Sequence, residues 1–431
     1  MKRFVSALLV VVLFAALLEG SIQAERANVR KKEALPELKV GVILNGDETE
    51  SYTKAHIHGI QAAAKKLGIS ENNIEWKTRI DGSDVCYDAA KSLAEDGCSL
   101  IIANSRVHQD YIKKAAEKFP DVNFVCIGGD YAAISQIDNF YNGYTAIYEA
   151  RYVSGVVAGM KLEEMLKKNQ IPEGSVDEEG RVRIGYVGSY PDAQTVSDYT
   201  AFYLGIKSIV SNVVMNVAYT HTDYDMELET TAADTLMNLG CVIIGQHDGS
   251  TGVPAAIQAR KDAGQIVYYV GCNADMSETA PTASLTSAVS NWKTYYLELF
   301  KKALHKEELP QDWCGGYAEN AVKITQLGSE TADGTETKVE ELEAAISDGT
   351  CKVFDTSTFT VSGGVVSDAK VDLSLLNEEN GEVVYPGETV EAIASEDGST
   401  YFAESKYRSA PYFTLRIDGI TELNAEETAE E

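Results

Sequence analysis

Polar side chains stand at several points where an apolar stretch of the chain stops. They follow VGVIL, LIIA and VCIGG in the first half of the chain, and CVIIG and YYVGC in the second half. In chain order they are Asn45, Asp47, Ser105, Asp130, Gln246, His247, Asn273 and Asp275. Amide, hydroxyl and carboxylate groups of this kind accept and donate hydrogen bonds to hydroxyls and ring nitrogens. The set therefore indicates the binding of a polar small molecule.

Aromatic residues near these points could enclose a flat or sugar-like ligand. Tyr52 lies between Ser51 and Thr53, Tyr131 follows Asp130 directly, and Phe202 lies on a predicted helix in the second half. An aromatic residue alone is more often a packing residue. We therefore hypothesise that the rings of Tyr52 and Phe202 stack on the flat part of a ligand from its two sides.

The carboxylates have a second interpretation, because loops that lead from a strand into a helix favour an acidic N-cap. For Asp47 and Asp275 the cap and the ligand contact both stay open. Asp130 is favoured as a ligand residue, because a carboxylate follows the corresponding strand in both halves of the chain.

Motifs for catalysis are missing from the sequence. It contains no G-x-S-x-G elbow, no phosphate-binding loop and no His or Asp cluster with metal spacing. The stretch DGSD at 81–84 lacks the rest of a calcium loop. We expect no catalytic residue, no metal and no cofactor. A secreted hydrolase that uses Asp130 and Asp275 as an acid–base pair is kept as the enzymatic alternative.

Short apolar segments alternate with helical patterns along most of the chain. The predicted strands span 38–44, 73–80, 99–105 and 122–130, and then 182–190, 213–221, 241–248 and 266–275. Nearly continuous apolar strands separated by amphipathic helices are typical of parallel sheets that are covered on both faces. Such sheets bind ligands beyond the carboxyl ends of their strands, where the polar residues of this chain lie.

The two halves also resemble each other. AKSLAEDGCSLII at 90–102 is similar to ADTLMNLGCVII at 233–244, and the glycines of the two segments, Gly97 and Gly240, are 143 residues apart. HGIQ around Gly59 and LGIK around Gly205 recur 146 residues apart. NFVCIGGD ending at Asp130 is similar to VYYVGCNAD ending at Asp275. Three segments in one order at nearly one spacing predict two lobes built on one plan.

The start of the chain predicts export. Lys2 and Arg3 precede an apolar run over 8–18, and small residues lead to Ala24, which is typical of a signal peptide over 1–24. The run is too short for a permanent membrane helix, and no Cys near Gly20 offers a lipid anchor. We expect a periplasmic or cell-surface protein. The net charge of −29 disfavours nucleic acid and anionic membranes as partners.

Seven cysteines remain after the apolar run. Cys98, Cys126, Cys241 and Cys272 lie in or beside predicted strands and are interpreted as buried hydrophobic residues. Cys314 and the last cysteine, Cys351, lie outside the strands and could form a disulfide or stay free.

The loop after the first strand carries a resemblance to a known family. Ser51, Tyr52, Thr53 and Gly59 are similar to a Ser-Phe-Asn motif and its following glycine in the basic membrane protein family of solute-binding proteins. Asp130 matches an aspartate at the fourth strand of that family. Tyr52 keeps the aromatic ring, whereas Thr53 does not keep the amide. Studied members of the family are purine-nucleoside receptors of ABC transporters.

The second half contains matches and departures. Phe202 and Gly205 resemble the end of the family's Phe-x-x-Gly-Phe-x-x-Gly segment, whereas Asp198 departs from its beginning. Asn273 stands where the family has an aspartate, and Ser290 stands where it has a lysine. The resemblance therefore implies a neutral contact at Asn273 and disfavours an anionic ligand.

The resemblance implies an α/β, type I periplasmic-binding fold with two doubly wound lobes and a ligand cleft between them. The expected first lobe is 38–141 with 277–314, and the second is 142–276 with 315–354, with crossings near 142–144, 275–278 and 315–318. Residues 355–420 are predicted to be a β-rich decoration of the second lobe. Residues 421–431 are predicted to be a disordered acidic tail.

The function implied is that of a monomeric solute-binding protein that captures a nucleoside or similar riboside by lobe closure. It would deliver this ligand to an ABC permease in the membrane. A ligand-sensing receptor domain would share the site, so it stays open as a second hypothesis. Neither reading involves nucleic acid.

Overall fold

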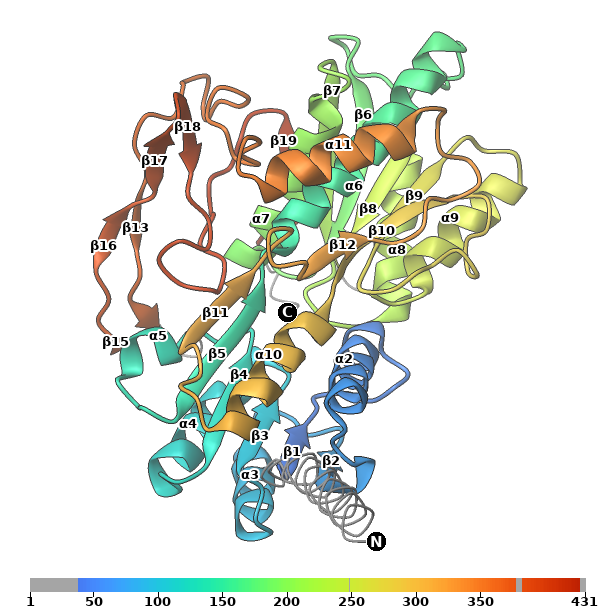
Figure 1. Ribbon diagram of the computed structural model, residues 1–431. Helices are drawn as coiled ribbons and strands as arrows, with labels where there is room; N and C mark the ends of the chain where they lie inside the picture. The colour runs from blue at the N-terminus through green and yellow to red at the C-terminus, as the bar shows by residue number, and fades with distance from the viewer. Residues whose placement is uncertain (1–37, 248, 377–381, 427–431) are drawn as a thin grey trace, which may run out of the picture.

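The computed structural model describes residues 38–247, 249–376 and 382–426, and the expected signal peptide lies outside these ranges. The chain forms two α/β lobes, each with a central sheet (Figure 1). The predicted fold class is therefore confirmed. In the described part of the chain, no helix has both the length and the hydropathy needed to cross a bilayer.

The first lobe is a parallel sheet with the strand order β2-β1-β3-β4-β5-β11. Its strands are β1 (Val40–Ile43), β2 (Ile74–Lys77), β3 (Leu100–Ala103), β4 (Asn123–Ile127), β5 (Phe140–Thr145) and β11 (Asp312–Gly315). Its helices are α2 (Ser51–Leu67), α3 (Asp84–Glu95), α4 (Gln109–Lys118), α5 (Ala132–Ser135) and α10 (Trp292–His305). Helices α2 and α10 cover one face of the sheet, and α3 and α4 cover the other.

The second lobe has the order β12-β10-β9-β8-β6-β7-β19, in which only β12 runs antiparallel among the described strands. Its strands are β6 (Val182–Gly188), β7 (Val213–Tyr219), β8 (Ile243–Gln246), β9 (Tyr268–Cys272), β10 (Ser284–Ser290), β12 (Val322–Ile324) and β19 (Ile420–Glu422). Its helices are α6 (Ile147–Lys167), α7 (Ala193–Lys207), α8 (Met226–Asn238), α9 (Gly252–Asp262) and α11 (Thr335–Ser347). Helices α6 and α7 cover one face, and α8 and α9 cover the other.

The internal repeat is visible in both sheets, because β2-β1-β3-β4-β5 and β7-β6-β8-β9-β10 have the same order. Gly97 and Gly240 each follow a helix with φ of +88°, a left-handed conformation that favours glycine. The cysteines that follow them are both buried at the start of a strand segment. The matching letters thus mark the same helix-to-strand turn in both lobes.

The second expected crossing between the lobes is wrong. Strand β10 pairs with β9 in the second sheet, so residues 277–290 belong to the second lobe and the chain crosses between Ser290 and Trp292. The polar stretch at 275–278 is a loop within one lobe. The first crossing follows Thr145, since all of β5 lies in the first sheet, and the third lies between β11 and β12.

The C-terminal segment forms small antiparallel pairs rather than a further layer. Its strands are β13 (Lys370–Asp372), β14 (Leu375–Leu376), β15 (Val383–Tyr385), β16 (Thr389–Glu391), β17 (Ile393–Glu396) and β18 (Ser399–Phe402). Figure 1 shows this segment in orange and red at the left, from β18 beside the second lobe to β15 beside α5 of the first. Leu375 is buried in a core cluster of the first lobe. The expected decoration of the second lobe alone is therefore corrected.

The expected disordered tail is also corrected for its first residues. Strand β19 pairs in parallel with β7, and the carboxylate of Glu422 accepts hydrogen bonds from the hydroxyls of Tyr199 (2.9 Å) and Tyr219. Asn424 adds a pair of side-chain hydrogen bonds to the backbone of Tyr219. The polar side chains of this stretch therefore bind buried tyrosine hydroxyls on β7 and α7. Residues 427–431 lie outside the described ranges.

Candidate ligand-binding site

The carboxyl ends of the strands of the two sheets face each other across the middle of the molecule (Figure 1). Two hydrogen bonds join the lobes there. Ser51 Oγ at the start of α2 donates to the carbonyl oxygen of Gly249 after β8 at 2.8 Å, and the hydroxyls of Thr145 and Ser290 lie 2.7 Å apart. The loops that follow the strands therefore meet at one place.

Gly249 leaves room for the Ser51 hydroxyl at this meeting point. A Cβ atom there would lie 1.7 Å from Ser51 Oγ, so the serine hydroxyl would have to rotate away from the Gly249 carbonyl oxygen. The same Cβ would lie 3.7 Å from Cβ of Asn273, which follows β9 with φ of +59°. Ser51 and Asn273, two predicted ligand residues from different lobes, are thus neighbours through Gly249.

Tyr52 forms the wall of the first lobe. Its hydroxyl donates to the carbonyl oxygen of Asn104 at 2.7 Å, and its ring lies edge-on to His56 with centroids 4.6 Å apart. His56 in turn packs on Trp292, with centroids 4.2 Å apart, and burial lowers the pKa of His56 to about 3. The imidazole is therefore neutral, and the Tyr52 ring is held in one orientation.

The second lobe places a buried charged group at the end of β8. Arg151 of α6 and Asp198 of α7 each expose 2% of their side chains, and Arg151 Nε donates to Asp198 Oδ2 at 2.9 Å. Arg151 also donates to the carbonyl oxygens of Gln246 (2.7 Å) and His247 (3.2 Å). Nδ1 of His247 lies 3.3 Å from Asp198 Oδ2. This arrangement fixes the loop after β8.

The Asp198 carboxylate is ionised and only partly used. Burial would raise its pKa, but the Arg151 guanidinium and then His247 hold the pKa below its ordinary value. Its Oδ1 atom is buried and has no hydrogen-bond partner among the described residues. A buried carboxylate oxygen without a donor is costly, so a ligand that supplies a hydroxyl or N–H group would be stabilised there.

Tyr144 connects the two walls. It lies on β5, next to the first crossing, and its side chain is buried. Burial raises the pKa of the Tyr144 phenol well above its usual range, and the nearby Asp198 carboxylate and Tyr52 phenol raise it further. Tyr144 packs in one buried cluster with Ala288 of β10 and Val322 of β12, so it lies between the two lobes, and its hydroxyl stays neutral.

Several predicted ligand residues lie elsewhere. Phe202 is a core residue with 1% exposure that packs on Tyr186, with ring centroids 5.7 Å apart, and therefore does not face Tyr52. The side chain of Gln246 is buried and bonded to Glu229 and Tyr269. The position of Phe202 on a helix is compatible with a core residue as well as with a ligand contact, and α7 places Phe202 in the core.

The acidic caps are visible as well. Asp275 is exposed and accepts from the Ser277 amide at 2.9 Å, as a turn cap does. Asp47 accepts from the Thr49 amide at 2.9 Å and from Arg79 Nε at 2.6 Å; the hydrogen bonds from Thr49 and then Arg79 lower its pKa to about 2. Both carboxylates thus hold local loop structure in this arrangement of the chain.

The remaining predicted residues divide into two groups. Asn45 is exposed, and its backbone amide donates to Asn104 Oδ1 at 2.8 Å. Ser105 follows Asn104 after β3 and is half-buried. Thr53 is buried and contacts Glu50 Oε2 at 3.2 Å. Asn45 and Ser105 therefore lie at the strand ends of the first lobe, whereas Thr53 lies within its helix contacts.

Asp130 and Tyr131 face the C-terminal segment. Tyr131 packs edge-on against Tyr385, with centroids 5.3 Å apart. Asp130 is buried, and its Oδ2 lies 3.7 Å from Arg408 Nη1. The position expected to contact a ligand thus has a cation from the same chain beside it.

Arg151, Tyr144 and Asp198 are site residues that the sequence reasoning did not identify. A signal for Arg151 was present, because an arginine inside the apolar stretch of α6 requires an acidic partner when it is buried. That partner, Asp198, was visible as a departure from the family motif. Asp198 lies 47 residues after Arg151 in the sequence, and no local pattern indicates that the two side chains are in contact.

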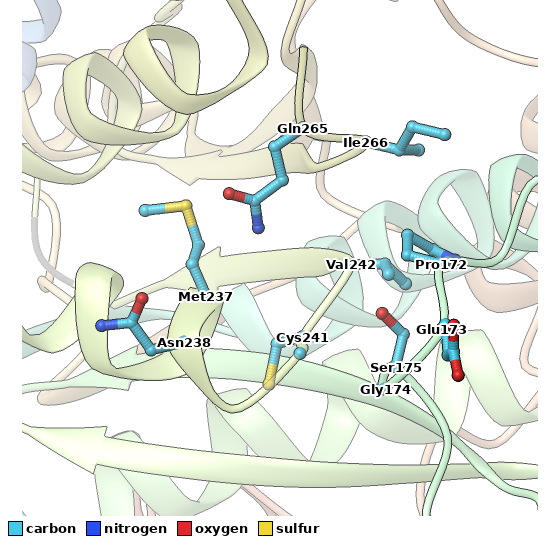
Figure 2. Close-up of a pocket in the computed structure, with 11 residues that line it drawn as sticks. Pro172, Glu173, Gly174, Ser175, Met237, Asn238, Cys241, Val242, Gln265 and Ile266 are labelled. Carbon is cyan, nitrogen blue, oxygen red and sulfur yellow. The ribbon is translucent and has the colours of Figure 1, made fainter. Parts of the chain in front are cut away.

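A separate cavity of about 240 Å³ lies in the second lobe, between the loop after α6 and the turns that precede β8 and β9. Figure 2 shows its lining, which includes Pro172, Met237, Cys241 and Gln265. These turns are at the amino ends of the strands. The cavity is therefore at the opposite end of the sheet from the meeting point of the lobes.

None of the seven cysteines, all of which lie in the described ranges, forms a disulfide, so Cys314 and Cys351 are not paired with each other. Burial raises the pKa of the Cys314 thiol to about 12. Among the described residues, no group of three or more His, Cys, Asp or Glu side chains is arranged to hold a metal ion.

Residues 38–355 match the model of the Bmp family, described as ABC transporter substrate-binding protein PnrA-like. A purine-binding protein of Brucella abortus is 30% identical over 318 residues, which cover 74% of this chain and 83% of the relative. The ABC transporter nucleoside-binding protein BmpA of Lactococcus lactis is 19% identical over 68% of this chain and 80% of its own length.

Solved structures support the fold. A solute-binding protein of an ABC transporter system from Aeropyrum pernix K1 has a TM-score of 0.61 at 17% identity, covering 74% of this chain and 93% of its own. One from Conexibacter woesei has a TM-score of 0.56 at 18% identity, covering 73% and 98%. With the match over 38–355 and the 30% identity, this chain belongs to the PnrA-like family of ABC transporter substrate-binding proteins.

Proposed function

We propose that this protein captures a nucleoside or similar riboside between its lobes and delivers it to a membrane permease. Membership of the PnrA-like family supports the class of function. The names of the relatives from Brucella abortus and Lactococcus lactis, a purine-binding and a nucleoside-binding protein, support the ligand class.

The observation that carries the ligand proposal is the buried Asp198 carboxylate. Its Oδ1 is unpartnered among the described residues, and it lies in the same electrostatic environment as Tyr144 and Tyr52. A riboside offers hydroxyl donors for the carboxylate and a flat base for an aromatic face. Stacking of a base on an aromatic side chain contributes about 1–3 kcal/mol in protein–base contacts.

The ligand is proposed to be uncharged. Asn273 offers an amide in place of the family's aspartate, and Ser290, in place of its lysine, is bonded to Thr145. The guanidinium of Arg151 is already paired with Asp198 and two carbonyl oxygens. A nucleotide phosphate would thus meet the Asp198 carboxylate without a free cation beside it, which disfavours phosphorylated ligands.

Capture is proposed to occur by closure of the lobes. The bond from Ser51 to Gly249 forms only when α2 and the loop after β8 approach each other. Closed and open forms would present different surfaces to the permease. Export with removal of 1–24 and a monomeric state are part of the same proposal.

The family is one of binding proteins, and the proposal includes no catalytic step. The hydrolase alternative needs Asp130 and Asp275 as a pair, but Asp130 lies beside Arg408 and Asp275 caps an exposed turn. A ligand-sensing domain would use the same site. It would be distinguished by a receptor partner in place of a permease.

Calorimetric titration with adenosine, guanosine, inosine and ribose tests the proposal. We expect one-to-one binding of at least one nucleoside, tighter than that of ribose. Asp198→Asn should weaken it at least about tenfold, because a charged hydrogen-bond acceptor is lost. Asp234→Asn is the matched control, since Asp234 is half exposed and its ion pair with Arg260 lies on the surface of the second lobe.

Two outcomes would overturn the proposal. One is the absence of heat with every nucleoside. The other is an unchanged affinity in Asp198→Asn while circular dichroism shows that the variant is folded. Tyr52→Leu, which removes the ring but keeps an apolar side chain, provides a second test of the base-stacking contact.

A further inference from the structure

We propose that the C-terminal segment, described over 356–376 and 382–426, is a strap that ties the two lobes together and sets how readily they separate. The segment begins directly after the region that matches the family, which ends at residue 355. Its effect on lobe separation is independent of the ligand. Its effect on ligand affinity rests on the function proposed above.

One end of the strap is anchored in the second lobe. Strand β19 extends the second sheet beside β7. Phe413 packs on Phe354 and Phe402, with ring centroids 4.4 and 4.8 Å apart, and all three rings are buried in the core cluster of that lobe. Lys207 of α7 adds a hydrogen bond of 3.0 Å to the carbonyl oxygen of Thr358. This end cannot separate from the second lobe without exposing core rings.

The middle of the strap is anchored in the first lobe. Leu375 of β14 is buried in the cluster formed by α3, α4 and their face of the sheet. Tyr385 of β15 packs on Tyr131, and the ammonium group of Lys113 lies 5.8 Å from the centroid of the Tyr385 ring. Because Leu375 is part of the core of the first lobe, the segment packs on the first lobe as well as on the second.

A compact loop over 403–412 provides the polar anchor. The hydroxyl of Tyr412 bonds to the carbonyl oxygen of Ala403 and accepts from the Lys406 amide at 3.0 Å, and Glu404 accepts from the Tyr412 amide at 3.1 Å. The loop is thus closed by its own side chains. Its tip, Arg408 and Ser409, is presented as a preformed unit.

The tip of the loop binds two acidic groups of the first lobe. Arg408 Nη1 lies 3.7 Å from Asp130 Oδ2, with 15% and 6% of the side chains exposed. The Ser409 amide donates to Asp312 Oδ2 at 2.8 Å. Asp312 begins β11, the strand that precedes the third crossing. The loop therefore binds the first lobe next to a crossing segment that must bend when the lobes open.

Opening of the lobes would break these contacts while the second-lobe anchor holds. Asp130 and Asp312 would lose their partners, and each already has one carboxylate oxygen unpartnered among the described residues. The strap thus favours the closed arrangement. Since apparent affinity scales with the fraction of protein in the competent state, the strap should tighten ligand binding and slow release.

Small-angle X-ray scattering of the ligand-free full-length mature protein tests the strap. Arg408→Ala combined with Asp312→Ala should increase the radius of gyration relative to the wild type, and Leu375→Ala should act in the same direction through the other anchor. Arg416→Ala is the matched control, because its contacts with Glu422, Thr414 and Pro191 stay on the second-lobe side. It should leave the radius unchanged.

Calorimetry with the nucleoside that binds the wild type provides the second readout. We expect about tenfold weaker binding in the double variant, within the usual range of conformational coupling. The strap is refuted if neither anchor variant changes the radius, or if Arg416→Ala increases it equally. An enlarged radius in a protein that binds no nucleoside would support the strap and overturn only the proposed ligand.

Discussion

Replacement of Arg151 by methionine is the most stringent stability test of the buried charged group. Methionine has a comparable length but neither charge nor donors. The change removes the 2.9 Å hydrogen bond to Asp198 and the bonds of 2.7 and 3.2 Å to the carbonyl oxygens of Gln246 and His247. Asp198 stays buried, with Nδ1 of His247 3.3 Å from its Oδ2 atom.

The magnitude follows from the burial of both partners. Removing one member of a buried ion pair costs about 3–5 kcal/mol, because the other charge is left without compensation. With a urea dependence of about 2–3 kcal/mol per molar, the unfolding midpoint should fall by roughly 1–2 M. Arg181→Met is the control: Arg181 is 38% exposed beside Asp177, so the unfolding midpoint should change little.

Urea unfolding followed by circular dichroism measures both values. Arg151→Met combined with Asp198→Leu should recover much of the lost stability, because no buried charge remains, but it should not bind ligand. A single variant as stable as the wild type would refute the assignment of Arg151 and Asp198 as a buried, mutually dependent pair.

Three further predictions concern other parts of the molecule. Burial raises the pKa of Glu404 to about 8, so the folded state holds a proton that the unfolded chain releases near pH 4.5, and the free energy of unfolding should fall as pH rises from about 4.5 to 8. Glu404→Gln should flatten this pH dependence in thermal unfolding, whereas an unchanged slope would argue against a protonated Glu404. Phe202→Ala should lower stability by about 3–5 kcal/mol in urea unfolding, as expected for a core ring, and a fully stable variant that loses only ligand binding would instead restore the stacking hypothesis. Gly249→Ala should weaken ligand binding about three- to tenfold in calorimetry, because its Cβ would displace the Ser51 hydroxyl and remove one hydrogen bond between the lobes. Binding equal to that of the wild type would show that this bond does not stabilise the ligand-bound form.

The fold could be predicted from the sequence because its signals are local and repeated. Alternation of short apolar runs with helices fixes parallel sheets, and the turn at Gly97 recurs at Gly240 with the same φ. Strand β10 was missed as a member of the second sheet, because its Ser and Thr residues weaken the apolar pattern. Its place depends on pairing with β9, which sequence spacing does not determine.

The candidate site was predictable only for residues in or next to the loops that follow strands. Ser51, His247 and Asn273 lie at the meeting point of the lobes because loop position alone places them there. The pairs Arg151–Asp198 and Arg408–Asp130 join elements far apart in the chain, and each depends on packing that no local pattern encodes.

The central claim is that a nucleoside occupies the space between Tyr52, Tyr144 and Asp198. Mass spectrometry of the small molecules released when the protein purified from its native cells is denatured tests this claim most directly. We expect an uncharged nucleoside in near-stoichiometric amount from the wild type and its loss from Asp198→Asn. A sugar without a base, a peptide, or equal amounts of nucleoside from both proteins would contradict it.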